Sequence, residues 1–379
     1  IHKYAGQPRI PAGVDVHPRA ALGEVQEELS ERPGVTVLIY DQVCAAEKRR
    51  RRKRGAYPDP QRRLFINEQV CEGCGDCGDK SNCVSLQPVE TPFGRKRRID
   101  QSSCNKDYSC VEGFCPSFVS VVGGRLRSRT GAGAVDIPDL PDATPAQLDD
   151  VLSVLIAGVG GTGVVTIGAV LGMAAHMEGK AASIMDVTGL SQKNGAVYSH
   201  LRLAPDPGRL RSAKIGRAGA DILLGCDMVA AATGEALAAI RTEETAMIID
   251  ADVSAVAAFT FMPDIDMDVD VMARRLQRVS DRDRSAMINA SALARRLLGD
   301  SIGANMMVVG AALQLGLLPL SVRSVEEAAR LNGVAVDMNV TALRLGRWAV
   351  VDPAALAAVA GVEDDIDAPK EQLSTAYIA

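Results

Sequence analysis

The cysteines are the residues of this chain whose type and spacing point most directly to chemistry. Seven of the nine cysteines lie between Cys71 and Cys115. They form two runs, which are Cys71, Cys74, Cys77 and Cys83, then Cys104, Cys110 and Cys115. Short spacers let a tight loop turn successive thiolates toward one small volume, and Gly73, Gly75 and Gly78 give the first loop the freedom to do so. The segment predicts a metal centre.

The pattern favours iron–sulfur clusters. Bacterial ferredoxins repeat C-x2-C-x2-C-x3-C-P, and the fourth cysteine of each run ligates the cluster of the other run. By this rule the first cluster takes Cys71, Cys74, Cys77 and Cys115. The second takes Cys83, Cys104 and Cys110, with Asp107 where a thiolate is missing. The spacers before Cys83 and Cys115 hold five and four residues, which is longer than in the ferredoxin pattern.

Asp107 leaves the nature of the second centre open. A carboxylate oxygen is a harder and weaker ligand for iron than a thiolate. The site is therefore compatible with a [4Fe–4S] cluster that has one Asp ligand, with a [3Fe–4S] cluster, or with no cluster. Zinc is the alternative for the whole segment, because C-x2-C pairs also bind zinc. A disulfide framework is disfavoured, since the chain does not resemble a small secreted domain.

Composition bounds the class of protein. The 379 residues suffice for two or three domains, and 47% are hydrophobic but only 3% aromatic, so the core must be aliphatic. A net charge of −5 argues against general nucleic-acid binding. No apolar run reaches the roughly 18 residues that span a membrane. Thiol-rich motifs indicate a reducing compartment, so we expect a cytoplasmic protein. The first residue is Ile1 rather than Met, which suggests part of a longer polypeptide.

The N-terminal region resembles the end of an α/β sheet. Residues 18–31 have helical periodicity, and the apolar run 35–40 suits a buried parallel strand. Cys44 then suits a buried position. The seven basic residues 48–54 predict a solvated loop, or alternatively a patch that docks an acidic protein such as ferredoxin or an anionic cofactor.

The remaining chain divides into a cysteine domain, a linker and an α/β region. Residues 84–103 are a basic insertion between the cysteine runs, and 126–150 are rich in Gly, Pro and Asp, as linkers are. Beyond the linker, strand-like runs occur at 152–157, 181–186, 222–224 and 246–250.

A glycine-rich loop follows the first of these runs. It matches G-x-G-x-x-G at a strand-to-helix turn, with its glycines at Gly158, Gly160, Gly161 and Gly163. Such a loop favours an anion at the helix N-terminus, and Asp186 ends the next run where a ribose-binding acid would lie. The same glycines also serve tight packing without a nucleotide. His200 and Cys226 are expected to be structural core residues.

Several segments together resemble a known family. They are CEGCGDC, RKRRIDQSSCNKDYSC, GFCPSF, VLIAGVGGTGV and GLSQKNGAVYSHLRL, and they are similar to the fused, long-form indolepyruvate:ferredoxin oxidoreductases. These belong to the thiamine-diphosphate-dependent 2-oxoacid:ferredoxin oxidoreductases. The resemblance implies an α/β protein with a ferredoxin-like iron–sulfur domain followed by a Rossmann-like gamma domain with a mostly parallel sheet. Its implied segments are 1–60 (the end of a thiamine domain), 61–125 (ferredoxin-like), 126–150 (linker), 151–350 (gamma) and 351–379 (extension).

The resemblance also implies a reaction and partners. An aryl 2-oxoacid such as indolepyruvate is oxidatively decarboxylated to an acyl-coenzyme A, and electrons pass through clusters to ferredoxin. The thiamine-binding G-D-G…N motif is not found, so thiamine diphosphate and Mg²⁺ are expected in the rest of the enzyme, which forms a homodimer. Gly160, Gly161, Lys193 and Arg202 become candidates to hold phosphate or carboxylate groups. The alternative is an iron–sulfur electron-transfer subunit of a flavin or NAD(P) oxidoreductase.

Overall fold

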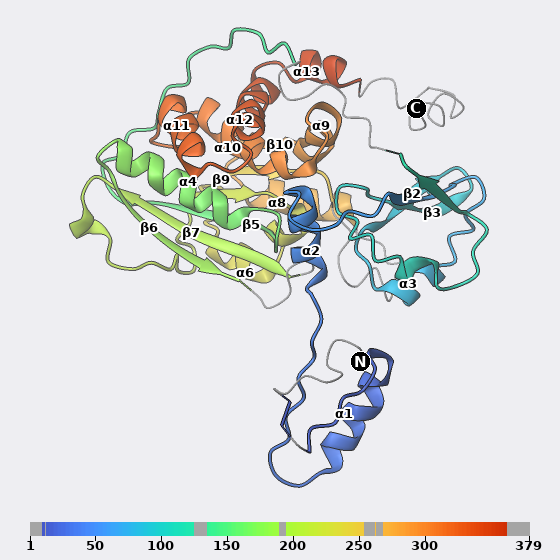
Figure 1. Cartoon of the computed structure of the whole chain (residues 1–379). Helices are drawn as coiled ribbons and strands as arrows, with labels where there is room; N and C mark the ends of the chain where they lie inside the picture. The colour runs from blue at the N-terminus through green and yellow to red at the C-terminus, as the bar shows by residue number, and fades with distance from the viewer. Residues whose placement is uncertain are drawn as a thin grey trace.

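The computed structural model describes residues 10–11, 13–124, 135–188, 195–253, 262 and 268–361. Its larger part is an α/β sandwich, and a smaller cysteine-rich part lies beside it (Figure 1). Helix α1 (Leu22–Glu31), preceded by η1 (Arg19–Ala21), stands apart from both, and extended chain joins it to α2 (Ala45–Lys53). No helix among these residues is long and apolar enough to cross a bilayer.

The cysteine-rich part consists of short elements around a small core. Two antiparallel pairs hold it: β1 (Arg62–Ile66) with β4 (Phe118–Val122), and β2 (Leu86–Thr91) with β3 (Gly94–Ile99). Between them lie α3 (Asp76–Ser81) and η2 (Ser109–Val111). Cysteine side chains themselves form part of the core, since Cys71 and Cys77 pack with Leu64, Leu86 and Ile99. The core of this part therefore includes side chains that the sequence predicts to be cluster ligands.

The α/β part is built on one mixed sheet with the strand order β10-β9-β8-β5-β7-β6. Four strands run parallel: β5 (Leu152–Val159), β8 (Ile222–Gly225), β9 (Ala246–Asp250) and β10 (Ala286–Ile288). The long β7 (Ala196–Ala204) is antiparallel to both β5 and β6 (Ala181–Val187). The predicted mostly parallel α/β architecture is confirmed for this part. All four predicted runs are strands, and β7 and the short β10 are the two strands of the sheet that were not among those runs.

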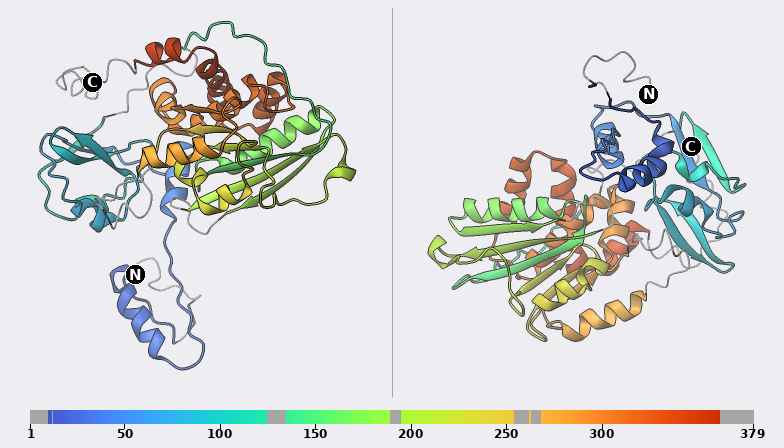
Figure 2. Two further views of the ribbon diagram at one scale, coloured as in Figure 1. Left: turned by 180° about the vertical axis from the view of Figure 1, so that it is seen from behind. Right: turned by 90° about the horizontal axis from the view of Figure 1, so that it is seen from below.

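Helices cover both faces of this sheet, as the view from below shows (Figure 2). One face packs on α4 (Val164–Met177), α9 (Ala290–Leu297), η4 (Ser301–Gly303), α10 (Ala304–Gln314), α11 (Val322–Asn332), α12 (Val336–Val351) and α13 (Pro353–Ala360). The other packs on α5 (Met228–Ala231), α6 (Gly234–Ala239) and α8 (Val269–Val279), and η3 (Pro207–Arg209) follows β7. Strand alternation explains the layers, because Val154 and Ile156 face one side while Leu155 and Ala157 face the other.

The buried strand predicted at 35–40 is wrong. These residues are extended but pair with no strand in the described chain, and Val35 and Ile39 are 96% and 84% exposed. An apolar β-branched run becomes a buried strand only when neighbouring strands supply partners, and the described chain supplies none. Cys44, expected to be buried, is exposed for the same reason. The predicted helix at 18–31 is present as α1.

Two further segments differ from expectation. Residues 48–54, predicted as a solvated loop, mostly form helix α2, which contacts both parts of the molecule. The linker has no helix or strand in its described portion, 135–150, but this portion packs against the α/β part. Ile137 and Leu140 pack on the sandwich core, and the Arg347 guanidinium donates to the Pro141 carbonyl at 2.7 Å. The rest of the linker lies outside the described residues.

Helices α10 and α12 approach each other through paired glycines. A Cβ on Gly310 would lie 1.9 Å from the Leu343 carbonyl oxygen, and one on Gly346 would lie 1.9 Å from that of Met307. Because both obstacles are backbone atoms, no rotamer change can relieve either clash. The contact therefore requires glycine on both helices.

We expect Gly346→Ala to lower the free energy of unfolding by about 1–3 kcal/mol or more, because α12 must move away from α10. Gly234→Ala is the matched control, since a Cβ there meets open space at the start of helix α6. That change should be neutral or stabilising by up to about 1 kcal/mol. Denaturant unfolding followed by circular dichroism measures both, and equal small effects would contradict the close contact.

Candidate iron–sulfur site

The first cysteine run forms a tight loop after β1. Gly73 and Gly75 have φ angles of 73° and 87°, which L side chains rarely adopt. A Cβ on Gly73 would also lie 2.2 Å from the Arg95 carbonyl oxygen, so strand β3 backs directly on the loop. The Gly73 amide donates to the Cys71 sulfur over 3.4 Å. Amide–sulfur hydrogen bonds of this kind help to set cluster potentials.

The second run forms a loop with strained backbone. Lys106 and Tyr108 have φ angles of 53° and 67° without being glycines, and the Lys106 amide donates to the Cys104 sulfur over 3.4 Å. The Tyr108 hydroxyl donates to the Arg62 carbonyl at 2.7 Å, which ties the loop to β1. Backbone strain held by such ties is common at ligand-binding positions.

The pairing of β1 with β4 brings the two runs together. The ladder continues past the strands, because the Asn67 amide donates to the Ser117 carbonyl at 2.8 Å. Cys115 lies just before this point and Cys71 just after it, and the Cys115 sulfur lies 3.0 Å from the Ser117 hydroxyl. The ends of a long loop thus meet at one place.

The groups that shift the pKa values of Cys77 and Cys110 indicate which thiols lie close to each of them. Burial raises the pKa of Cys77 to about 11, and the nearby thiols of Cys71, Cys115 and Cys74 raise it further while Arg97 lowers it. Burial likewise raises the pKa of Cys110 to about 12, with Cys83, Cys104, Asp107 and, from the first run, Cys77 adding to the effect. The Cys115 thiol thus lies near thiols of the first run and the Cys83 thiol near thiols of the second. The exchange of ligands between the runs stays a prediction.

A cavity lies at the second group. Its lining includes Cys83, Cys104, Cys110 and Asp107, together with apolar and basic side chains from β1, β3 and the second loop. The Asp107 side chain is exposed and accepts a hydrogen bond from the Ser109 hydroxyl at 3.2 Å. Three thiols and one carboxylate around a single cavity are a donor set that fits an iron–sulfur cluster.

Among the described residues, no three His, Cys, Asp or Glu side chains converge closely enough to hold one metal ion. An iron–sulfur cluster requires a wider spacing of its ligands than a single metal ion does. Each of its thiolates binds a different iron, so the sulfur atoms stand farther apart than the ligands of one ion.

Basic side chains surround both cysteine groups. On β3, the Lys96 ammonium donates to the Cys71 carbonyl, and Arg97 is only 3% exposed beside Cys77. Helix α2 borders the second group, where the Arg49 and Arg52 guanidinium groups donate to the Ser103 and Asn105 carbonyls at 2.7 and 2.6 Å. The basic segments of the sequence therefore face the cysteines rather than solvent alone.

Helix α2 also joins the two parts of the molecule. Its last residue, Lys53, pairs with Asp300 of the α/β part at 2.5 Å. One short helix thus contacts the loop around Cys104 and the loop before α10. Figure 1 shows α2 at this junction.

The glycine loop connects β5 to α4, as the sequence predicts. A Cβ on Gly158 would lie 2.6 Å from Val164 and 3.2 Å from Cys226, so this glycine is required for packing. Gly163 has a φ of 105° at the start of α4, and the Asn305 side chain donates to the Thr162 carbonyl at 2.7 Å. Gly160 and Gly161 lie between them. Helix packing and a side chain from α10 fix the loop conformation.

The dinucleotide interpretation of this loop fails on strand order. The strand that carries Asp186 is β6, and β7 separates it from β5, whereas a ribose-binding acid follows the parallel strand beside the first. Arg202 pairs with Ser153 at the opposite end of β5, about 20 Å from the loop at 3.3 Å per residue. Lys193 lies outside the described residues. The structure therefore does not bring Arg202 together with the candidate glycines.

The carboxyl edge of the sheet holds a buried acid that the sequence interpretation missed. Asp250 ends β9 at 1% exposure and accepts hydrogen bonds from the Ser291 hydroxyl at 2.5 Å and amide at 3.1 Å. Burial raises its pKa to about 7 against these hydrogen bonds. An Asp directly after an apolar strand was the available signal. Beside it Cys226 is buried, and His200 is a core histidine that accepts from the Ile215 amide, both as predicted.

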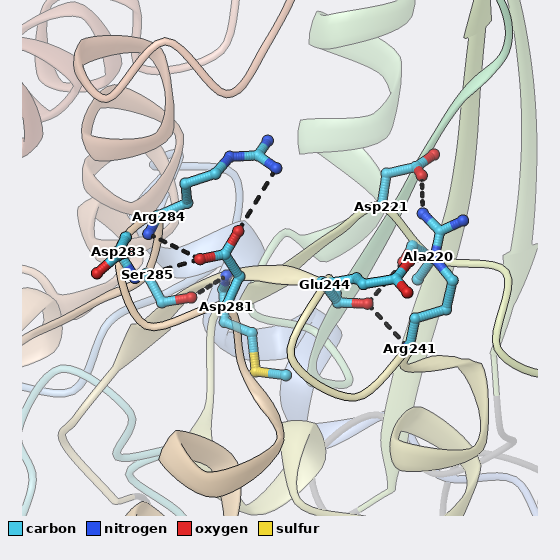
Figure 3. Close-up of polar contacts among 10 residues, drawn as sticks. Ala220, Asp221, Arg241, Glu244, Asp281, Asp283, Arg284 and Ser285 are labelled. Carbon is cyan, nitrogen blue, oxygen red and sulfur yellow. Dashed lines mark hydrogen bonds and ion pairs between the residues drawn. The ribbon is translucent and has the colours of Figure 1, made fainter.

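The amino edge of the same sheet carries a separate polar network (Figure 3). Arg241 pairs with Asp221 at the start of β8, and the Ser285 hydroxyl accepts from the Met247 amide of β9 at 2.8 Å. Asp281 accepts from the amide of Arg284 at 3.3 Å. These contacts join loops that lead into neighbouring strands, which indicates a structural role.

Comparison with known proteins places the larger part of the chain. Residues 153–349 match the family described as pyruvate ferredoxin/flavodoxin oxidoreductase. The chain belongs to this family. The match begins after the cysteine segment, so it bears on the α/β part alone.

Relatives within the family have narrower names. An "indolepyruvate oxidoreductase subunit IorB" of Archaeoglobus fulgidus is 28% identical over 203 residues, which are 52% of this chain and 93% of that protein. The protein of the same name from Pyrococcus horikoshii is 27% identical over 203 residues, with 51% and 93% covered. A keto/oxoacid ferredoxin oxidoreductase gamma subunit from Geobacter sulfurreducens, of known structure, is 18% identical over 53% of this chain and 98% of its own, with a TM-score of 0.38.

Asp250 gives the family domain a testable pH dependence. Its pKa is about 7 in the folded chain and 3.8 normally, so between these values the folded state holds a proton that the unfolded state loses. Stability should therefore fall as pH rises from about 4 to 7, by at most about 1.4 kcal/mol per pH unit.

Asp250→Asn, which is neutral at every pH, should remove this part of the pH dependence. Thermal unfolding between pH 5 and pH 8 measures it, and the exposed Asp186→Asn should retain the wild-type profile. Parallel profiles for Asp250→Asn and wild type would show that Asp250 titrates normally.

Proposed function

We propose that this chain is the iron–sulfur and gamma-domain portion of a 2-oxoacid:ferredoxin oxidoreductase, acting on indolepyruvate or a related aryl 2-oxoacid. The observation that carries the proposal is a family domain preceded, in the same polypeptide, by two groups of thiols. An oxidoreductase that delivers electrons to ferredoxin needs one-electron carriers, and iron–sulfur clusters supply that chemistry. The names of the IorB relatives support the substrate class.

In this proposal, the cysteines and Asp107 of segment 61–125 act as cluster ligands. Cys71, Cys74, Cys77 and Cys115 hold the first cluster. The second cluster is held by Cys83, Cys104, Cys110 and Asp107. The Gly73 and Lys106 amides donate to ligand sulfurs, and the buried core around Leu64 limits access of water. We assign this segment as a ferredoxin-like domain.

The N-terminal segment 1–60 is proposed to complete a thiamine-binding domain that lies mainly outside this chain. Its exposed apolar side chains support this, because Val35, Val37 and Ile39 are 76–96% exposed. Exposed apolar runs mark surfaces that pack against something else. We therefore favour the fused, long-form architecture. The rest of the enzyme would hold thiamine diphosphate and Mg²⁺, and the full enzyme would be a homodimer.

The α/β part is proposed to form a wall of the site for substrate and coenzyme A. The loop from Gly158 to Gly163 lies at the carboxyl edge of the parallel strands, where ligands of open α/β sheets bind. Lys193 lies between β6 and β7 in the sequence and outside the described residues, and it stays a candidate for phosphate or carboxylate binding. A dinucleotide bound at the glycine loop would instead favour the flavin or NAD(P) alternative.

Ferredoxin is the proposed electron acceptor, and the outer face of α2 is suited to an acidic protein. Arg50, Arg51 and Arg54 are 43–66% exposed and share the single carboxylate of Glu47, which leaves an excess of positive charge. The inner face of the same helix contacts the second cysteine loop. A carrier docked on α2 would therefore lie next to the second cluster.

Anaerobically purified protein should be brown, absorb near about 400 nm and bleach with dithionite. Iron and acid-labile sulfide should reach about eight per chain, or about seven irons if the second cluster is [3Fe–4S]. Electron paramagnetic resonance of the reduced protein identifies the cluster types. Dithionite-reduced protein should also reduce added oxidised ferredoxin.

About four irons would support the first cluster alone and remove the second from the proposal. Colourless protein, or protein that holds only zinc, would contradict the redox function altogether. Bound NAD(P), retained through purification, would favour the alternative oxidoreductase.

A further inference from the structure

Arg49 is one of two side chains of α2 that hydrogen-bond to the second cysteine loop. Its guanidinium Nη1 donates to the Ser103 carbonyl at 2.7 Å, while Arg52 donates to the Asn105 carbonyl at 2.6 Å. These carbonyls lie immediately before and after Cys104. The two arginines therefore hold the backbone on both sides of one cysteine from a helix more than fifty residues earlier in the sequence.

The charge of Arg49 has no direct counter-ion. Within the described residues, no carboxylate lies within salt-bridge distance of its guanidinium, and its Nε is buried with no hydrogen-bond partner. The nearest acids are engaged elsewhere, since Asp300 pairs with Lys53 and Asp100 accepts from Ser102. Burial lowers the pKa of Arg49, and Asp300, Asp100 and Cys104 only oppose that effect.

A half-buried cation without a counter-ion is disfavoured, and it is retained where a negative charge completes the site. The Arg49 guanidinium lies against the loop that contains Cys104. An iron–sulfur cluster with thiolate ligands is an anion that would supply the missing charge.

We infer that Arg49 is a positioning and charge-compensating residue for the second cluster, which it holds through the Ser103 carbonyl and whose midpoint potential it raises. The inference rests on the proposed function of the second cysteine group. Reduction adds one electron, hence one negative charge, to the cluster. A nearby cation stabilises the reduced form more than the oxidised form, and the effect is strong where water is excluded.

The other arginines of α2 provide an internal contrast. Arg51 lies on the outer face, 51% exposed, and pairs with Glu47. Its charge is screened by solvent and compensated by a neighbour, so it should have little influence on a buried cluster. Arg49 and Arg51 thus carry the same charge on the same helix, but they lie on different faces of it.

The test compares Arg49→Met, Arg49→Lys and the control Arg51→Met in the full chain, purified anaerobically. Potentiometric titration with dithionite, followed by electron paramagnetic resonance, gives the midpoint potential of each cluster. Arg49→Met should lower the potential of the cluster that Cys110→Ala removes and leave the other unchanged. Arg49→Lys should stay close to wild type because it keeps the charge, and Arg51→Met should match wild type.

If Arg49→Met loses the iron of the second site while Arg49→Lys keeps it at the wild-type potential, charge compensation is also supported. Unchanged potentials in Arg49→Met would overturn the inference. So would an equal shift of both clusters, loss of iron from both Arg49 variants, or a shift in Arg49→Lys as large as in Arg49→Met. Wild-type protein without two clusters would instead overturn the proposed function of the second group, and with it this inference.

Discussion

The antiparallel pairing of β1 with β4 is the contact on which the proposed chemistry depends. It joins the ends of a long loop, with Ile66 opposite Phe118 and the Asn67 amide bonded to the Ser117 carbonyl. Cys71 and Cys115 lie just beyond these residues, on the same side of the pairing. Without this closure, each cysteine run would lack a fourth thiol from the other. Closing the loop costs chain entropy, which the strand pairing and the small core around Leu64 oppose.

Charge is the second constraint on the cysteine part. Thiolates and clusters are anions, and the chain as a whole is acidic at −5. Basic side chains are nevertheless concentrated at the cysteines: Lys96 and Arg97 beside the first group, Arg49 and Arg52 beside the second. Arg97 is buried and Arg49 is half-buried. Two basic stretches of the sequence that suggest surface patches are thus partly internal.

Sequence reasoning succeeded where the signal was local. The strands at 152–157 and 222–224 are apolar runs bounded by turn residues, and the glycine loop follows a strand as its spacing requires. The grouping of the cysteines rests on a known exchange of ligands between runs and stays a prediction. These inferences need only the neighbouring residues or a motif with a physical rule behind it.

The failures concern partners that are distant in sequence. The apolar run 35–40 has the composition of a buried strand but no strand beside it in the described chain, and periodicity does not reveal that. Asp186 lies at the end of a strand as expected, yet β7 separates that strand from β5. Topology and long-range partners decided these two cases. The basic run 48–54 differs, because Ala45, Glu47 and the Lys and Arg residues of α2 are all good helix formers, so its helix had a local signal.

The exchange of ligands between the two runs is the central claim, and paired substitutions test it directly. Iron counting on anaerobic protein should show that Cys71→Ala with Cys115→Ala removes one cluster, about four irons, and spares the other. Cys71→Ala with Cys83→Ala should remove both clusters. If the second pair removes only one cluster while the first pair removes both, each run binds its own cluster and the account is contradicted.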